Sequence, residues 1–330
     1  MEVILSVKNL SIGVRSLGYK QLLSSVEDIS FDIYPGEILG LLGESGSGKS
    51  MTALSITRLL DGNKEVTKGS ILYRNRNNEV KNLLSLDEKE MLAIRGKEIS
   101  MIFQEPFSSL NPLVKAGTQI AEVLELHGVK DKKQNKIRVK ELLEKLKLPQ
   151  PEKIMDSYPH RLSGGMCQRV MIALAIICRP GLLIADEPTT ALDQSTQNEI
   201  LTLLKEINRE HGSSLLFISH DLGVIKKLCN RVLVMYSGRI LEEGNTDEVF
   251  SAPAHEYTKG LLGSIPDRTK RGKDLAAIPG KIPSLEEGRP EGCPFHPRCA
   301  RAEARCKEEF PPEREISATH RTRCILGVNK

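Results

Sequence analysis

The chain has 330 residues, 39% of them hydrophobic, and its 47 basic residues nearly balance its 43 acidic ones. A chain of this size and composition is expected to fold into one large or two modest globular domains. The net charge of only +4 gives no electrostatic case for a nucleic-acid partner. The longest apolar run, residues 170–177, is far shorter than the roughly 20 residues of a membrane span. The N-terminus also lacks a signal-peptide pattern, so we expect a cytoplasmic protein.

Short strands alternate with helices up to about residue 250, the pattern of a parallel sheet covered on both faces. Two early segments, residues 4–10 and 29–33, are predicted as antiparallel strands. Further strands are predicted at residues 38–42, 99–103, 182–185, 215–219 and 232–236. Between them, one apolar helical face is marked by Val139, Leu142, Leu143 and Leu146.

The composition changes near residue 251, where the chain becomes rich in Pro and Gly and poor in apolar runs. Such a segment buries little apolar surface, so we expect a bound centre to keep it ordered. Four of the seven cysteines fall here, at Cys293, Cys299, Cys306 and Cys324. An odd cysteine total without a secretion signal argues against disulfides and favours metal ligands.

These four cysteines are widely spaced, with intervals of five, six and seventeen residues and no C-x2-C pair. Structural zinc sites ordinarily use close pairs of ligands. A four-iron cluster accepts wider spacing. We therefore predict a [4Fe-4S] cluster, with Zn²⁺ as the main alternative and four free thiols as the third.

Residues 43–50 read Gly-Glu-Ser-Gly-Ser-Gly-Lys-Ser and match the pattern G-x-x-x-x-G-K-[ST]. The motif lies between the predicted strand 38–42 and an apolar helical run, which disfavours a flexible Gly/Ser linker. Its glycines let backbone N–H groups turn toward an anion at a helix amino end. Lys49 would reach the outer phosphates, and the Ser50 hydroxyl would bind Mg²⁺. The predicted ATP contacts are Gly43, Glu44, Ser45, Gly46, Ser47, Gly48, Lys49, Ser50 and Met51.

The strand at residues 182–185 is followed by two acids, Asp186 and Glu187. Adjacent acids are usually only solvated, but an upstream phosphate-binding motif favours a catalytic pair. Asp186 would hold Mg²⁺ directly or through water. Glu187 would orient the water that attacks the γ-phosphate.

Residues 162–169, Leu-Ser-Gly-Gly-Met-Cys-Gln-Arg, resemble the LSGGQ signature of ABC-type ATPases, with Met166 where Gln is usual. Further marks of that family follow the expected order: Gln104 in the Q-loop, Asp193 in the D-loop and His220 in the H-loop. The resemblance covers residues 1–250. It implies an α/β P-loop NTPase fold of the ABC type, with a parallel-sheet core, an antiparallel β subdomain and a helical subdomain at about residues 105–178.

The same resemblance implies roles for these residues. Ser163, Gly164, Gly165 and Met166 would contact an ATP bound by the opposite subunit, so that two ATPs are sandwiched in a dimer. His220 would contact the γ-phosphate, and Gln104 would sense Mg²⁺ and relay to a membrane partner. Tyr19 is the best spaced candidate for stacking on adenine, with a plain surface position as the alternative.

Residues 293–299, Cys-Pro-Phe-His-Pro-Arg-Cys, resemble the C-terminal extension of ATPase subunits of oligopeptide and dipeptide importers. Residues 104–112 resemble the Q-loop of the same group, so the resemblance covers nearly the whole chain. It implies an ATPase at the cytoplasmic face of the membrane that energises peptide uptake. Its partners would be two permease subunits, an extracellular peptide-binding protein, and either a related ATPase or a second copy. Nickel importers share this sequence style, so nickel is the alternative cargo.

Two other functions are less favoured. A DNA-repair ABC ATPase with a zinc site would carry a coiled-coil insertion and a basic excess, which this sequence lacks. A metal-cofactor assembly ATPase would more typically end near residue 250. We divide the chain into an ATP-binding domain, 1–250, and a small irregular metal-binding extension, 251–330. We expect the cluster to order this extension while nucleotide binding by residues 1–250 stays independent of it.

Overall fold

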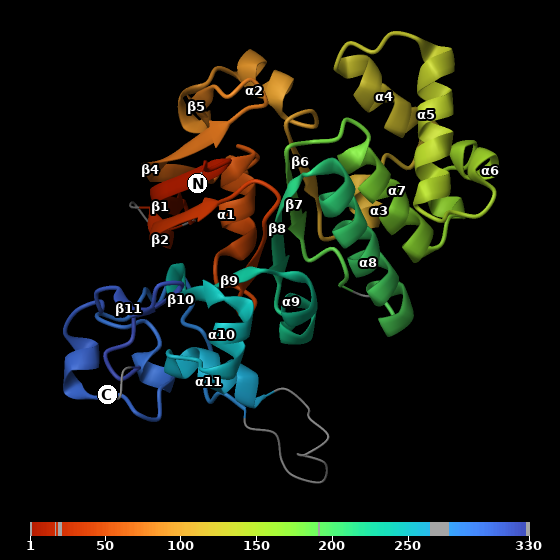
Figure 1. The fold of residues 1–330 in the computed structure, drawn as a ribbon. Coiled ribbons are helices and arrows are strands. Elements are labelled where there is room, and N and C mark those ends of the chain that lie inside the picture. The colour runs from red at the N-terminus through yellow and green to blue at the C-terminus, as the bar shows by residue number, and fades with distance from the viewer. Residues whose placement is uncertain (1, 17, 19–21, 191, 265–276, 328–330) are drawn as a thin grey trace. The chain divides into compact units, whose positions relative to one another are not determined.

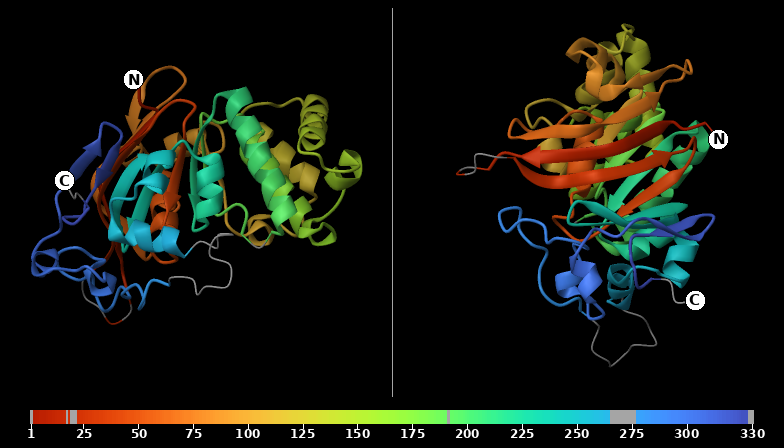
Figure 2. Two further views of the ribbon diagram at one scale, coloured as in Figure 1. Left: turned by 60° about the horizontal axis from the view of Figure 1, so that its bottom comes forward. Right: turned by 90° about the vertical axis from the view of Figure 1, so that its left-hand side faces the viewer.

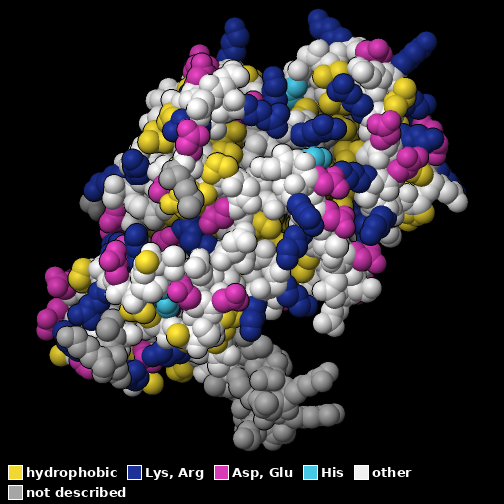
Figure 3. Space-filling model, viewed as in Figure 1, with side chains coloured by type: hydrophobic (Ala, Val, Ile, Leu, Met, Phe, Trp, Pro, Cys, Tyr) yellow, Lys and Arg dark blue, Asp and Glu magenta, His cyan; other side chains and the backbone are white. Residues whose placement is uncertain are grey.

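The computed structural model describes residues 2–16, 18, 22–190, 192–264 and 277–327 (Figure 1). The chain divides into two compact units. Unit 1 comprises Met1–Leu5, Ile33–Glu37 and Leu72–Leu216, and unit 2 comprises Ser6–Asp32, Ile38–Ile71 and Phe217–Lys330. Among the described residues, no helix is both long and apolar enough to cross a membrane. Basic and acidic side chains alternate over the face shown in Figure 3, as the balanced composition predicts.

One sheet of unit 2 contains β2 (Leu23–Ile33), β1 (Leu5–Val14) and β4 (Lys64–Arg74), in that order. In β2 the side chains of Ile29, Phe31 and Ile33 are buried, whereas Ser30 between them is exposed. This period of two is expected for a strand with one face on the core. The last residues of β4 belong to unit 1, where they pair antiparallel with β5 (Val80–Asn82).

The second sheet of unit 2 runs in the order β11 (Arg314–Ser317), β12 (His320–Thr322), β10 (Arg239–Asn245), β9 (Arg231–Tyr236), β3 (Ile38–Leu42). The pair β3 and β9 is parallel, with Leu39 opposite Arg231 and Leu42 opposite Val234. The pairs β9–β10, β10–β12 and β11–β12 are antiparallel. The end of the chain therefore extends the sheet that carries β3, and Figure 2 shows this blue segment beside the cyan β10.

The helices of unit 2 are α1 (Lys49–Ile56), α9 (Leu222–Leu228), α10 (Thr246–Ser251) and α11 (Glu256–Gly263). The start of α11 is fixed by a buried carboxylate on β10, that of Glu242. This carboxylate accepts hydrogen bonds from the backbone N–H groups of Ala254 (2.6 Å) and His255 (2.9 Å), and from Nε2 of His320 (2.7 Å). Because three donors satisfy the buried charge, Glu242 joins β10, α11 and β12 into one structure.

Unit 1 contains the parallel pair β6 (Ile99–Ile102) and β7 (Leu182–Asp186), with Ile99 opposite Leu182. Its helices are α2 (Glu88–Ile94), α3 (Pro106–Ser109), α4 (Ala116–Leu126), α5 (Lys132–Lys145), α6 (Pro151–Met155), α7 (Gly164–Ile176) and α8 (Gln194–His211). Helix α4 packs against α5, α6 and α7 (Figure 1), and α7 also packs against β6. Strand β8 (Ser214–Ser219) continues from unit 1 into unit 2.

Every strand predicted from the sequence is present, although β1 continues to Val14 and β2 already begins at Leu23. Val139, Leu143 and Leu146 of the predicted helical face are buried in or at the end of α5. The sequence reasoning missed β4, β5, β10, β11 and β12. These strands are short or rich in polar residues, so they carry no strong apolar run.

Candidate nucleotide-binding site

Residues 43–50, the phosphate loop, connect β3, which ends at Leu42, to α1, which begins at Lys49. Gly46 and Gly48 have φ angles of 80° and 102°, a left-handed conformation that other residues rarely adopt. A Cβ atom on Gly43 would lie 2.2 Å from the carbonyl oxygen of Met235. Three glycines of the motif are therefore required by the backbone itself, and the predicted strand–loop–helix is confirmed.

The loop is equipped to receive an anion. Lys49 is only 4% exposed, and its ammonium donates to the carbonyls of Gly43 (2.8 Å) and Glu44 (2.9 Å), which holds its charge at the loop. The hydroxyl oxygen of Ser47 is buried and has no hydrogen-bond partner among the described residues. Burying such a group without a partner costs about 1–3 kcal/mol, which a bound phosphate would offset. These residues fit a nucleotide polyphosphate.

A contact that sequence reasoning did not find ties this loop to the end of the chain. Arg298 forms a bidentate ion pair with Glu44, with Nη1–Oε2 at 2.6 Å and Nη2–Oε1 at 3.1 Å. The Arg298 side chain is 7% exposed and that of Glu44 is 30% exposed. The hydrogen bond to Glu44 raises the pKa of Arg298, which stays charged. This contact joins the C-terminal extension to the phosphate loop, and the expectation that nucleotide binding is independent of the extension stays a prediction.

Aromatic side chains support the same region of unit 2. Tyr236 at the end of β9 contacts Tyr257 in α11 and Phe295, with ring centroids 4.7 and 5.4 Å apart. The hydroxyl of Tyr257 accepts the backbone N–H of Glu44 at 3.0 Å. Burial raises the pKa of Tyr257, so the hydroxyl keeps its proton. Sequence reasoning placed Tyr236 on a strand but did not find its contacts with Tyr257 and Phe295, because these partners are distant in sequence.

In unit 1 the two predicted catalytic acids follow one another at the end of β7. Asp186 is buried, and Glu187 has a φ angle of 47°. A non-glycine residue in this left-handed region stores backbone strain, a feature that gathers at functional sites. The Glu187 carboxylate accepts hydrogen bonds from Thr190 Oγ1 (3.0 Å) and Gln104 Nε2 (3.3 Å). The structure thus brings together Gln104 and Glu187, which come from the ends of two neighbouring strands.

The segment 163–166 opens α7. Ser163 is the N-cap, and its Oγ accepts the N–H of Met166 at 3.4 Å. A Cβ atom on Gly164 would meet nothing closer than 3.9 Å, so a ligand can approach the amino end of this helix. Farther along, Gln168 donates to the carbonyl of Pro188 at 2.7 Å, which connects α7 to the turn after Glu187.

The predicted site residues Asp193 and His220 lie at the amino ends of helices, and Tyr19 lies outside the described residues. Asp193 caps α8, and its hydrogen bonds with Thr196 and Ser195 lower the pKa of its carboxyl group. His220 is exposed and directly precedes Asp221, the N-cap of α9. Ser50 and Met51 lie in the first turn of α1. Tyr19 lies outside the described residues, so its predicted stacking role stays a prediction.

The four C-terminal cysteines line one cavity with His255, Phe295 and Leu326. Gly292 makes this approach possible, because a Cβ atom there would lie 2.3 Å from the carbonyl oxygen of Cys306. Burial, followed by the neighbouring cysteines, raises the pKa of Cys293 to about 12. The donor chemistry fits a thiolate-bound centre. However, no group of three or more His, Cys, Asp or Glu in the described part of the chain is arranged to hold a metal ion, so the predicted metal-binding extension is not supported.

Comparison with known proteins resolves the family. Residues 26–190 match the ABC transporter family, and residues 241–306 match the C-terminal region of oligopeptide/dipeptide transporters. The oligopeptide transport ATP-binding protein of Haemophilus influenzae is 45% identical over 307 residues, covering 93% of this chain and 92% of that protein. The dipeptide transport ATP-binding protein of Bacillus subtilis is 44% identical over 327 residues, covering 99% and 95%. This chain belongs to the ABC transporter family.

A solved structure of an ABC cassette supports the same assignment. The dimeric post-hydrolysis state of an ATP-binding cassette, bound to ADP and Pi, is 28% identical with a TM-score of 0.64 and covers 73% of this chain and 98% of that one. The ABC-type P-loop fold predicted from the sequence is confirmed. As an ABC protein the chain is an ATP-hydrolysing transporter subunit, for which ATP and Mg²⁺ are expected.

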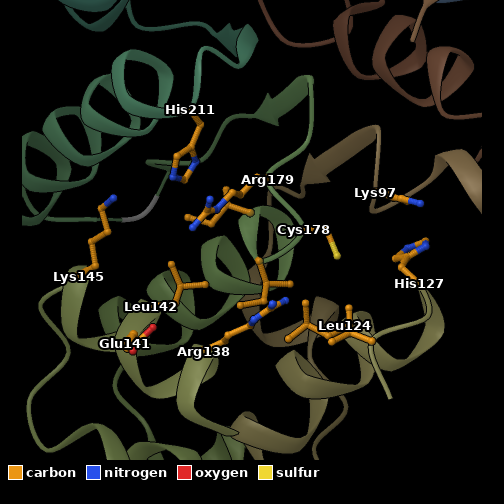
Figure 4. A pocket seen from close by; sticks show the side chains of 13 residues that line it. Lys97, Leu124, His127, Arg138, Glu141, Leu142, Lys145, Cys178, Arg179 and His211 are labelled. Carbon is orange, nitrogen blue, oxygen red and sulfur yellow. The ribbon is translucent and has the colours of Figure 1, made fainter. Parts of the chain in front are cut away.

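A second cavity, of about 530 Å³, opens among α4, α5, α7 and α8 in unit 1 of this ABC protein (Figure 4). Its basic lining residues are Lys97, His127, Arg138, Lys145, Arg179 and His211. Helices α4, α7 and α8 all end at this cavity. Burial, followed by Lys97 and by Lys145 respectively, lowers the pKa of His127 and of His211. Because the signature opens the opposite end of α7, this cavity is separate from the signature residues.

Proposed function

We propose that this chain energises the import of dipeptides or oligopeptides by hydrolysing ATP on the cytoplasmic face of the membrane. The observation that carries the proposal is similarity to peptide transport ATP-binding proteins over nearly the whole chain, including the C-terminal region at residues 241–306. Similarity confined to the ABC core would support no statement about the transported solute. Nickel remains the alternative cargo, because nickel importers share this sequence style.

In this proposal one set of residues binds the nucleotide and Mg²⁺, and another acts on the attacking water and the γ-phosphate. The phosphate loop binds the polyphosphate through its backbone N–H groups and Lys49. Ser50, Gln104 and Asp186 would hold Mg²⁺, which would offset phosphate charge. Glu187 polarises the attacking water, and His220 contacts the γ-phosphate. Tyr19 would stack on the adenine.

The hydrogen bonds of Glu187 suit that role. Thr190 and Gln104 both donate to Oε2, which orients the carboxylate. The strained backbone at Glu187 supports a position selected for function rather than for stability. Gln104 is at once a carboxylate partner and a proposed Mg²⁺ ligand, so it can report nucleotide occupancy.

A second ATPase subunit completes each site in this proposal. Ser163, Gly164, Gly165 and Met166 would contact ATP bound by the partner, and Asp193 would belong to the D-loop. The accessible amino end of α7 supports this, since it offers unhindered N–H groups to a phosphate. A related ATPase subunit is the preferred partner, and a second copy of this chain is the alternative.

Two permease subunits and an extracellular peptide-binding protein would complete the transporter. Exposed apolar side chains near the Q-loop support a docking surface for the permeases. Phe107 in α3 is 53% exposed and Leu113 is 84% exposed. Such side chains close together on one segment are more typical of an interface than of free surface.

We also propose that Cys293, Cys299, Cys306 and Cys324 bind a [4Fe-4S] cluster, with Zn²⁺ as the alternative. The support is their shared cavity and their soft thiol donors. A bound cluster would cross-link loops of the extension. Anaerobically purified protein should then contain iron and sulfide, whereas stoichiometric zinc without either would favour the alternative.

Uptake in cells tests the cargo. Cells that depend on this transporter should lose uptake of labelled dipeptide or oligopeptide when the chain carries Lys49→Ala, and ⁶³Ni uptake should stay unchanged. The matched control is Lys64→Ala, which removes a surface ion pair with Asp61. Loss of nickel uptake with intact peptide uptake would assign the alternative cargo.

A further inference from the structure

We propose that Arg298 is a positioning residue for the phosphate loop and that the C-terminal segment uses it to set the affinity for ATP. This inference rests on the proposed function only in requiring that the loop binds ATP. Arg298 belongs to a turn, His296–Arg298, between Cys293 and Cys299. Its bidentate partner, Glu44, is the second residue of the phosphate loop.

The charge of Glu44 explains why this contact matters for binding. A carboxylate in a loop that receives a polyphosphate repels the ligand, and repulsion is strongest where water is excluded. Arg298 neutralises this carboxylate with two charge-assisted bonds, of 2.6 and 3.1 Å, and is itself buried. Without Arg298, the loop would present a negative charge to an incoming anion.

Arg298 is also held in place from its other side. Its Nε donates to the carbonyl of Pro279 at 2.8 Å, and its guanidinium lies 5.7 Å from the ring centroid of Tyr236. The backbone N–H of Glu44 is fixed separately by the Tyr257 hydroxyl. Both the side chain and the backbone of Glu44 therefore depend on residues beyond 235.

A second arginine of the C-terminal segment supports the loop indirectly. Arg289 donates from Nε to the carbonyl of Ser237 at 2.6 Å, in the turn between β9 and β10. The next residue in that turn, Gly238, donates its N–H to the carbonyl of Ser47 at 2.9 Å. The segment thus reaches the phosphate loop at two points, directly through Arg298 and through this turn.

A purely structural role is the competing explanation, in which the ion pair only holds the extension against the rest of unit 2. The two roles predict different effects of a second substitution, Glu44→Gln, on the ATP affinity of Arg298→Ala. If charge and position at the loop matter, Arg298→Ala weakens binding because Glu44 is left unpaired, and adding Glu44→Gln restores binding because the stranded charge is gone. If the pair has only a structural role, the single and double variants loosen the extension equally, and the ATP affinity does not depend on the charge of either residue.

Binding of a non-hydrolysable ATP analogue to the full chain, measured by calorimetry, tests the proposal. Arg298→Ala should raise Kd about tenfold, equivalent to about 1.4 kcal/mol, and Arg298→Ala/Glu44→Gln should return to within about threefold of the wild type. Arg298→Lys should fall between, since it keeps the charge but loses the bidentate geometry. Arg301→Ala is the matched control, because Arg301 pairs with Glu256 at 2.8 Å on the surface of the same segment.

Hydrogen exchange supplies a second readout that a purely structural role would not produce. By linkage, the analogue should slow amide exchange in residues 293–299 of the wild type and not in Arg298→Ala. Unchanged Kd in Arg298→Ala, or a double variant as weak as the single one, would overturn the proposal. Absence of analogue binding by the wild type would instead count against ATP binding itself.

Discussion

The phosphate loop of unit 2 and the Gln104–Glu187 pair of unit 1 differ in how firmly they are held. Lys49 is buried with bonds of 2.8 and 2.9 Å, and Glu44 is fixed through both its side chain and its backbone. Gln104 and Ser163 are exposed, and their bonds to Glu187 and Met166 measure 3.3 and 3.4 Å. N–H···O bonds beyond about 3.2 Å are weak. The phosphate-binding residues are therefore preformed, whereas Gln104 and the signature can rearrange when ATP and a partner arrive.

The largest expected effect is on ATP hydrolysis, from a substitution that leaves the preformed phosphate loop unchanged. Glu187→Gln should lower kcat by about 10²–10⁴-fold, the contribution of a general base, and leave ATP affinity unchanged. Steady-state hydrolysis and analogue binding measure the two separately. Glu199→Gln, which alters an exposed carboxylate paired with Arg169 in unit 1, is the control. Near wild-type turnover in Glu187→Gln would remove this residue from the mechanism.

The next effect acts on the preformed loop. Lys49→Ala should weaken ATP binding about 100-fold, because a charge-assisted contact to phosphate contributes up to about 3 kcal/mol. Titration with a fluorescent ATP analogue gives the affinity directly. An unchanged Kd would mean that the buried ammonium serves the loop backbone and not the nucleotide.

A smaller effect is expected at the Gln104–Glu187 pair. Gln104→Ala should lower kcat about tenfold, in line with the loss of one hydrogen bond to a charged group worth about 1.5 kcal/mol. ATP affinity should hold, since the loop is independently fixed. A loss of affinity as large as that of Lys49→Ala would show that Gln104 belongs to the preformed part of the site.

The smallest effect concerns the helix cap at the signature. Ser163→Ala should reduce the free energy of unfolding by only about 0.5 kcal/mol, the low end for an N-cap, because its bond to Met166 is long. Asp193→Ala should cost more stability, since its carboxylate caps α8 with two bonds of 3.0 Å. Urea unfolding monitored by circular dichroism compares the two. Equal losses would contradict the inference that the signature cap is loosely held.

The same contrast explains what the sequence could and could not predict. Apolar runs identified the strands β3, β7 and β8, and contiguous motifs identified the phosphate loop and the signature. Local patterns could not reveal the pair Glu44–Arg298, because 254 residues separate its partners. Nor could they place β11 and β12 beside β10, since these short polar strands gain their stability from pairing and not from their own hydrophobicity.

The cysteine extension shows the limit of composition. Its lack of apolar runs predicted a segment that depends on a bound centre, yet the structure also orders it through protein contacts. His320, Phe295 and Arg298 each join it to the rest of unit 2. Each is a single residue outside any periodic apolar pattern, so hydrophobic periodicity does not predict its contact. The role of a metal there stays a proposal.

The most direct test of the central claim measures binding and turnover of the purified chain over a range of protein concentrations. A preformed loop in one chain predicts that ATP already binds at protein concentrations too low for the subunits to associate. A signature that acts on the ATP of another subunit predicts that turnover per chain rises steeply with concentration, or on adding the partner ATPase. Full, concentration-independent turnover by a demonstrated monomer would contradict the account.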